Sequence, residues 1–175
     1  GSLIMARPLL VNAAELLRRP GTERLISLPI GAVDLGLSDS RFTADEIIDV
    51  QLRLESLTDG IVVVGTIAVP WRGQCRRCLR DLAEVAISDV DELYQTQVTN
   101  TEAFEIVDNQ LDLLPMVREL ALLDAPLAPL CQPDCAGLCP ICGIDLNDQQ
   151  CTCVPAPVDS QWAVLDQLKA QLDGN

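Results

Sequence analysis

An alternation of apolar and polar residues marks the middle of the chain. In the stretch IIDVQLRLESL, Val50, Leu52 and Leu54 are separated by polar side chains, which predicts a strand with one buried face. After the turn TDG comes GIVVVGTIAVPW, a run too continuously apolar for a strand with only one buried face, so we place it centrally in a sheet. Asp59 and Gly60 between these strands predict an antiparallel hairpin.

Further strands are predicted on both sides of this hairpin. The segments ERLISLPI and LAEVAISDVDELY have strand-like patterns, and a short strand is expected in EIVDNQLDL. Near the start of the chain, LLVNAAELLRRPG predicts a short strand and then a helix that begins with Asn12 as N-cap and stops at Pro20 and Gly21. These elements indicate a mainly antiparallel sheet with short helices.

Two more helices are predicted in the second half of the chain. The first is capped by Asp112, carries Pro115 in its first turn and cannot continue past Pro126 and Pro129. Its predicted apolar side consists of Leu113, Leu114, Val117, Leu120 and Leu123. The second starts at Ser160 and has apolar residues at helical spacing, namely Trp162, Leu165, Leu168 and Leu172.

The fold class predicted from these elements is α+β, with an antiparallel β-sheet core, a cysteine-rich zinc-stapled loop and a C-terminal helix. We expect residues 1–129 to form the sheet domain with short helices, and residues 130–175 to form the zinc-binding segment and terminal helix, packed on the same domain. A chain of 175 residues with 49% hydrophobic content is sufficient for such a core.

Composition narrows the compartment and the chemistry. No stretch approaches the roughly 20 apolar residues of a membrane span, and the start GSLIMARPLL lacks a signal-peptide pattern. We therefore expect a cytoplasmic protein without a membrane partner. The chain has no histidine, which excludes Ser-His and Cys-His nucleophile pairs and leaves metal binding to thiolates and carboxylates.

Charge divides the chain into two unequal halves. The net charge is -14, yet residues 1–80 carry ten basic and nine acidic side chains, whereas residues 81–175 carry two basic and seventeen acidic ones. This balance argues against a protein that coats nucleic acid, because phosphate neutralisation requires clustered Lys and Arg. The acidic half could instead contact a basic protein.

Six of the eight cysteines lie in the stretch LCQPDCAGLCPICGIDLNDQQCTC, residues 130–153. The motif CPICG has the spacing of a rubredoxin-like knuckle, in which one tight turn directs two sulfurs at a single ion. Cys151 and Cys153 offer a second chelating pair. The first predicted ligand set is therefore Cys139, Cys142, Cys151 and Cys153. The remaining cysteines form a second complete set, Cys75, Cys78, Cys131 and Cys135.

The sequence leaves several interpretations of these cysteines open. The ligands could be divided differently, or a single zinc could leave four spare thiols. We expect one or two structural Zn²⁺ ions, because an all-thiolate shell closes the site and offers no open catalytic position. The alternatives are an iron-sulfur cluster, a disulfide framework, which reducing conditions disfavour, and a dithiol redox centre at Cys75 and Cys78.

Four arginines surround the first cysteine pair in WRGQCRRCLRD. Arg72, Arg76, Arg77 and Arg80 could form a phosphate-binding face on a rigid knuckle, with Trp71 available for stacking. The alternative is that they pair with nearby carboxylates or offset the charge of a four-thiolate centre.

The motif CRRCL after a β-branched strand, then PLAPLCQPDCAGLCPICGIDLN and CTC, then a helix with Trp and Leu, resembles the YceD family of large ribosomal RNA subunit accumulation proteins. The resemblance extends from about Leu9 to Leu172. It implies a non-enzymatic ribosome-biogenesis factor that supports accumulation or maturation of large-subunit rRNA, with precursor rRNA or a pre-50S particle as partner. A thiol-based oxidoreductase or redox sensor using Cys75 and Cys78, and an adaptor for a basic ribosomal protein, remain the alternatives.

Overall fold

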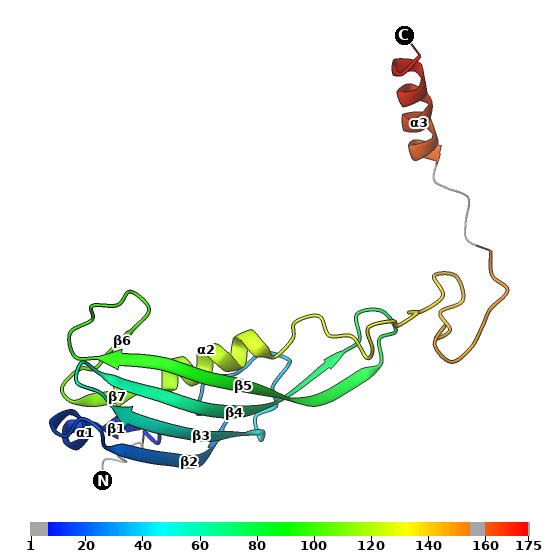
Figure 1. Ribbon diagram of the computed structural model, residues 1–175. Helices are drawn as coiled ribbons and strands as arrows, with labels where there is room; N and C mark the ends of the chain where they lie inside the picture. Colours follow the sequence, from blue (N-terminus) through cyan, green and yellow to red (C-terminus); the bar gives the residue numbers. More distant parts are fainter. Residues whose placement is uncertain (1–6, 155–159, 175) are drawn as a thin grey trace. The chain divides into compact units, whose positions relative to one another are not determined.

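The computed structural model of the chain describes residues 7–154 and 160–174 (Figure 1). The chain divides into two compact units. The first unit comprises the chain up to Gln74 together with Asp81–Pro129, and the second comprises Cys75–Arg80 together with the chain from Leu130 onward. The second unit is therefore assembled from two segments that are far apart in the sequence.

The first unit contains most of the regular structure. Its elements are β1 (Leu10–Asn12), α1 (Ala14–Arg18), β2 (Glu23–Gly31), β3 (Ile47–Ser56), β4 (Ile61–Gln74), β5 (Asp81–Gln95), β6 (Phe104–Glu105), β7 (Gln110–Asp112) and α2 (Leu114–Asp124). The second unit contains α3 (Ser160–Leu172) and the cysteine-rich loops.

Five strands form the main sheet in the order β2-β3-β4-β5-β6. The first four are antiparallel to their neighbours, and β6 pairs with β5 in parallel. A separate two-stranded sheet joins β1 to β7. The predicted antiparallel sheet and the hairpin around Asp59 and Gly60 are confirmed. The apolar run in β4 lies centrally as expected, but only one of its faces is buried, because within the described residues of the first unit the opposite face of the sheet has no helix on it.

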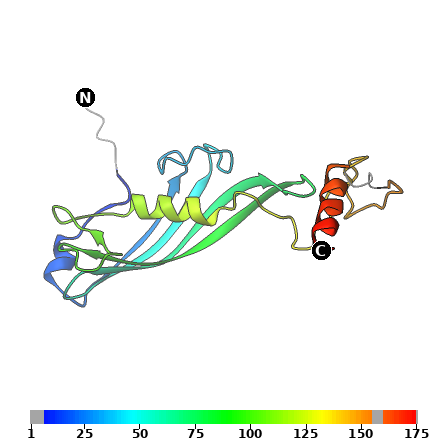
Figure 2. The same cartoon turned by 90° about the horizontal axis from the view of Figure 1, so that it is seen from above.

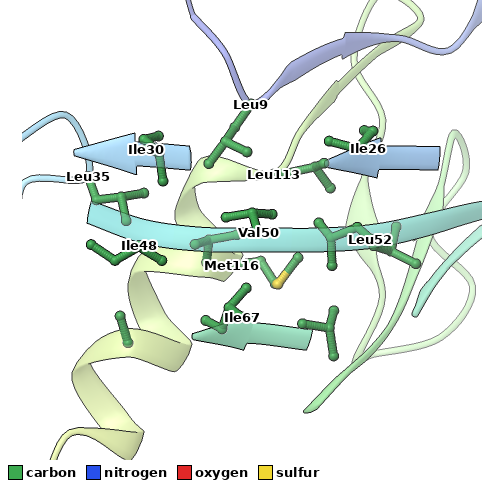
Figure 3. Close-up of a cluster of buried hydrophobic side chains, with 14 of the residues drawn as sticks. Leu9, Ile26, Ile30, Leu35, Ile48, Val50, Leu52, Ile67, Leu113 and Met116 are labelled. Atoms are coloured by element: carbon green, nitrogen blue, oxygen red, sulfur yellow. The ribbon is translucent and has the colours of Figure 1, made fainter. Parts of the chain in front are cut away.

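The core lies on one face of the main sheet, under α2 (Figures 1 and 2). In β3 the alternating residues Ile48, Val50, Leu52 and Leu54 are all buried, as their period predicts. Figure 3 shows Met116 of α2 among the apolar side chains of the strands. One face of the sheet therefore carries the packing that stabilises the first unit.

The helix α2 differs from the prediction in two details. Its buried residues are Met116, Val117 and Ala121, whereas Leu123, expected on the apolar side, is exposed. Leu113 occupies the N-cap position, one residue after Asp112, yet the Asp112 carboxylate accepts the N–H of Leu114 at 3.2 Å and so satisfies a free donor at the helix start, as predicted for a capping residue.

The helix α1 differs in the same way at its start. Its N-cap is Ala13, one residue after the predicted Asn12. The Asn12 side chain nevertheless accepts the N–H of Ala14 at 3.0 Å, so it still satisfies one of the free donors at this helix end.

A buried arginine holds the end of α2. The Arg41 guanidinium donates to the carbonyl of Leu122 at 3.0 Å and to that of Ala125, and it forms an ion pair with Asp39 at 2.7 Å. The last carbonyls of a helix lack partners within the helix, so this cation satisfies them and complements the helix dipole. Within residues 7–154 and 160–174, no helix is long and apolar enough to cross a bilayer.

Candidate metal centre

All eight cysteines gather in the second unit, in two sets of four. In chain order, the first set is Cys75, Cys78, Cys131 and Cys135, and the second set is Cys139, Cys142, Cys151 and Cys153. Within each set every pair of sulfurs lies within 4.8 Å, and all eight thiols are free. These are the two sets predicted from the sequence. The four-and-four grouping leaves no spare thiol.

The distances between sulfurs fit a single tetrahedral ion. With a zinc-sulfur bond of about 2.3 Å, the edge of a tetrahedron is about 3.8 Å. The Sγ atoms of Cys75 and Cys135 lie 3.7 Å apart, and so do those of Cys78 and Cys131. A disulfide requires about 2.05 Å, so these pairs have the spacing of co-ligands.

Each set begins with a knuckle, and the two knuckles have the same backbone hydrogen bonds. In the first, the N–H of Leu79 donates to the carbonyl of Cys75 and the N–H of Cys75 donates to that of Arg80. In the second, Gly143 donates to Cys139 and Cys139 donates to Ile144, with distances between 2.8 and 2.9 Å throughout. The segments CRRCLR and CPICGI therefore form the same turn.

The residue after the second cysteine has a positive φ in both knuckles. Gly143 adopts +76° at no steric cost, whereas Leu79 adopts +61°, a conformation that is unfavourable for a residue with a side chain. Glycine at position 143 is a sequence signal for such a turn, whereas leucine at position 79 is not. A strained leucine is kept in place by the other contacts of the turn.

Asn147 connects the loop of the second set to the first set. Its side-chain amide donates to the sulfur of Cys135 at 3.3 Å, and its carbonyl oxygen accepts the N–H of Ala136 at 2.8 Å. Asp145 holds this amide with a further hydrogen bond of 2.8 Å. Residues between two ligands of one site thereby orient a ligand of the other, a role that sequence analysis did not identify.

The surroundings lower the pKa of some thiols and raise that of others. The backbone N–H of Cys78 lowers the pKa of Cys75 to about 5, and those of Cys142 and Ile141 lower the pKa of Cys139 to about 6. In contrast, burial raises the pKa of Cys131 to about 12, and the hydrogen bond with the Cys142 thiol raises that of Cys153 to about 12. Four adjacent thiols resist full ionisation, and a bound cation would compensate their charge.

The four candidate phosphate-binding arginines do not share one environment. Arg72 belongs to the first unit and pairs with Glu46 at 3.2 Å. Arg80 pairs with Asp145 and Asp148, both at 3.3 Å, and Arg77 donates to the carbonyl of Cys135 at 3.1 Å. Arg76 is exposed and has no hydrogen-bonding or ion-pair partner among the described residues.

Comparison of the sequence with known proteins identifies relatives over the part of the chain that holds the cysteines. The family model described as "Large ribosomal RNA subunit accumulation protein YceD" matches residues 63–169, which include both cysteine sets. An uncharacterized protein of Mycobacterium tuberculosis (strain ATCC 25618 / H37Rv) is 32% identical to this chain over 94% of its length and 83% of the relative. One from Mycobacterium leprae (strain TN) is 29% identical over 93% and 78%.

A plant protein matches a shorter part of the chain. The "Large ribosomal RNA subunit accumulation protein YCED homolog 1, chloroplastic" of Zea mays is 38% identical over 56 residues, 31% of this chain and 19% of that protein. No solved structure gives a significant match. With the family model covering more than half of its length, the chain belongs to the YceD family.

Proposed function

We propose that this protein is a non-enzymatic ribosome-biogenesis factor with two structural zinc ions, and that it supports accumulation or maturation of large-subunit rRNA by binding. The observation that supports the structural part most strongly is the arrangement of eight thiols in two sets of single-ion size. The family description supports the ribosomal part.

Zinc suits both sets better than the alternatives. Four thiolates at tetrahedral spacing complete the coordination of one zinc ion and leave no position for a substrate or an activated water. A four-iron cluster would bind each cysteine through a different iron, which favours a wider separation of the sulfurs. The dithiol redox interpretation is disfavoured because Cys75 and Cys78 share their site with two further thiols.

Arg76 and Arg77 are the residues best suited to contact rRNA phosphate. Both are exposed on the first knuckle, and the Arg77 partner is a backbone carbonyl, which leaves the guanidinium charge uncompensated. Arg72 and Arg80 instead have carboxylate partners, so they contribute less free positive charge. The contact with rRNA therefore centres on the tip of the CRRC knuckle.

The test is charge reversal of Arg76 and Arg77 to Glu in the full chain. Binding to precursor large-subunit rRNA and to pre-50S particles should weaken, and the log-log salt dependence should become shallower by about 0.7 to 0.9 per lost phosphate contact. Zinc content should stay unchanged, because guanidinium groups are not ligands. Filter binding over a salt series and elemental analysis measure the two quantities.

The matched control reverses Arg18 and Arg19, two exposed arginines of the first unit, and changes the net charge by the same amount. If both double variants lose affinity equally, the effect is one of overall charge and the knuckle is not the contact. Unchanged binding and an unchanged salt slope after reversal of Arg76 and Arg77 would reject the rRNA contact.

A further inference from the structure

The face of the main sheet opposite α2 carries an unusual combination of side chains. Along each strand, alternate side chains point into the core and the others point to the opposite side. The strand register brings these other side chains together, and we call the surface that they form the outer sheet face. They are Leu25, Ser27 and Pro29 of β2; Ile47, Asp49, Gln51, Arg53 and Glu55 of β3; Val62, Val64, Thr66, Ala68 and Pro70 of β4; and Val85, Ile87, Asp89, Asp91 and Leu93 of β5.

An apolar stripe runs along β4 in the middle of this face. Four of its five outward residues are apolar, and register adds Ile87 beside Ala68 and Val85 beside Pro70. Ile87 is 64% exposed and Val85 is 55% exposed. Within the described residues of the first unit, the helices pack on the opposite face (Figures 1 and 2). Contiguous exposed apolar surface of this kind is typical of a binding site.

Carboxylates border the stripe on both neighbouring strands. On β3, Asp49 lies opposite Ala68, and on β5, Asp89 lies opposite Thr66 and Asp91 lies opposite Val64. All three acids are exposed. The single guanidinium of the face, Arg53, pairs with Glu23 at 4.0 Å. The face thus combines an apolar centre with acidic margins.

The same face contains a hollow beside the stripe. It has a volume of about 380 Å³ and its lining includes Leu25, Gln51, Arg53 and Val64. Leu25 is 77% exposed at its margin. A hollow of this size can receive one large apolar side chain of a ligand, the usual form of an interface anchor.

From these features we propose that the outer sheet face binds an amphipathic helix of a basic protein, with its apolar side on β4 and its Lys and Arg side chains directed at β3 and β5. Adjacent strands are about 4.8 Å apart, so β3 and β5 are about 10 Å apart, close to the diameter of a helix. A helix lying along β4 would therefore bring its two basic margins to the two acidic margins of the face.

Charge complementarity favours a basic helix over a second copy of the chain, RNA, an anionic lipid surface or α3. A second copy of the chain would bring the same acidic margins against each other, and RNA or an anionic lipid surface would be repelled. The described part of α3 has exposed leucines, but its charged residues are Asp166 and Lys169, which do not supply a positive margin. The inference needs neither the metal ions nor the arginines, so it can fail independently of the proposed function.

The test uses a defined probe and the full chain. The probe is a labelled peptide of roughly 18 residues, five helical turns, with leucine at every third or fourth position and lysine elsewhere. Its counterpart keeps the leucines and replaces lysine with glutamate. Fluorescence anisotropy should detect saturable binding of the lysine peptide, weaker at high salt, and no binding of the glutamate peptide.

Two variants then locate the binding site. Ile87→Ser removes an exposed apolar side chain, and the pair Asp89→Lys with Asp91→Lys reverses the β5 margin; each should weaken binding about tenfold or more. The matched control, Glu119→Lys with Asp124→Lys, makes the same charge change at exposed positions of α2, on the opposite side of the sheet, and should weaken binding by much less. Circular dichroism confirms that each variant is folded.

Several outcomes would overturn the inference. One is equal loss of peptide binding in the control and the β5 variant, which indicates attraction by net charge alone. Others are a dimer in sedimentation equilibrium that Ile87→Ser dissolves, binding of anionic vesicles through this face, and protection of its amides from hydrogen exchange that disappears when residues 160–175 are removed.

Discussion

At the scale of single residues, Asn147 is not a ligand, yet its side chain donates a hydrogen bond to a cysteine sulfur. It follows Asp145 by two residues, and both side chains take part in one hydrogen-bonded turn. The same side chain reaches the Cys135 sulfur. A hydrogen bond of this kind orients a ligand toward the ion.

Replacing Asn147 with Ala should therefore weaken metal binding at the set that contains Cys135. Loss of a group that orients a ligand typically costs 10-fold to 100-fold in metal affinity. Competition with a chromophoric chelator, and the absorption of the cobalt-substituted protein, measure this change. The second set should keep its affinity, because the Asn147 side chain has no hydrogen bond with its sulfurs among the described residues.

Gln132→Ala is the matched control for this substitution. Gln132 donates to the Asn147 side chain at 3.2 Å but has no hydrogen bond with a sulfur among the described residues. Its removal should leave cobalt absorption and chelator competition nearly unchanged. Equal effects of the two substitutions would mean that the loop, and not the donor to sulfur, determines the affinity.

The cysteines of the site were predictable and their supporting residues were not. Thiol spacing determines which pairs can chelate one ion, so CxxC and CxC indicated the set of Cys139, Cys142, Cys151 and Cys153, and the other set followed as the four remaining cysteines. The contact of Asn147 with Cys135 joins segments that are apart in the sequence, and leucine at position 79 is not a residue type that signals a positive φ. One signal could have identified Asn147, namely an Asp-x-Asn sequence enclosed between two chelating pairs, where a side chain commonly closes a turn.

At the scale of elements, the strand patterns determined most of the fold. Period two in β3 reflects the burial of one face, which one sequence reveals directly, whereas in the β-branched run of β4 only alternate residues are buried. The pairing of β1 with β7 and the clamp of Arg41 on α2 were not predictable, because each joins segments about 80 to 100 residues apart without a local signal. Leu123 shows the same limit: helical spacing cannot tell which side of α2 meets the sheet.

Glu92 of β5 is partly buried and lies close to several other carboxylates. Burial raises the pKa of Glu92, and the charges of Asp91, Glu119 and Glu102 raise it further. Stability linked to this group is present below the ordinary glutamate pKa of 4.5 and is lost as pH rises through the higher folded value. Glu92→Gln should therefore stabilise the protein at pH 7 but not at pH 4.

Urea unfolding of both proteins at several pH values measures this difference. Glu105→Gln in β6 is the control, an exposed acid that loses the same charge without the burial of Glu92. A stabilisation that is the same at pH 4 and pH 7 would contradict the electrostatic explanation and indicate better packing of the amide.

At the scale of the whole molecule, the two units depend on different sources of stability. The first unit has an extended apolar core of strands and helices. The buried hydrophobic residues of the second unit, within the described ranges, are four of its cysteines, Cys75, Cys78, Cys135 and Cys139. Burial alone cannot offset the ordering entropy of its loops, and metal binding at the two cysteine sets, worth about 10 to 16 kcal/mol in zinc-finger peptides, would supply the difference.

Removal of one cysteine ligand should therefore destabilise the second unit without destabilising the first. Cys142→Ser should lower the zinc content from two ions per chain to one and expose residues 139–153 to proteases, because its set loses the closed coordination that orders the loop. The amides of β3 and β4 should keep their protection from hydrogen exchange, since they belong to the unit with the apolar core. Elemental analysis, limited proteolysis and exchange measured by mass spectrometry follow the three quantities.

Ser160→Ala, which adds no thiol and removes none, is the control for substitution in the second unit. Full zinc content with unchanged protease resistance in Cys142→Ser would mean that Cys142 is not a ligand, and a general loss of protection in β3 and β4 would mean that the metal stabilises both units together.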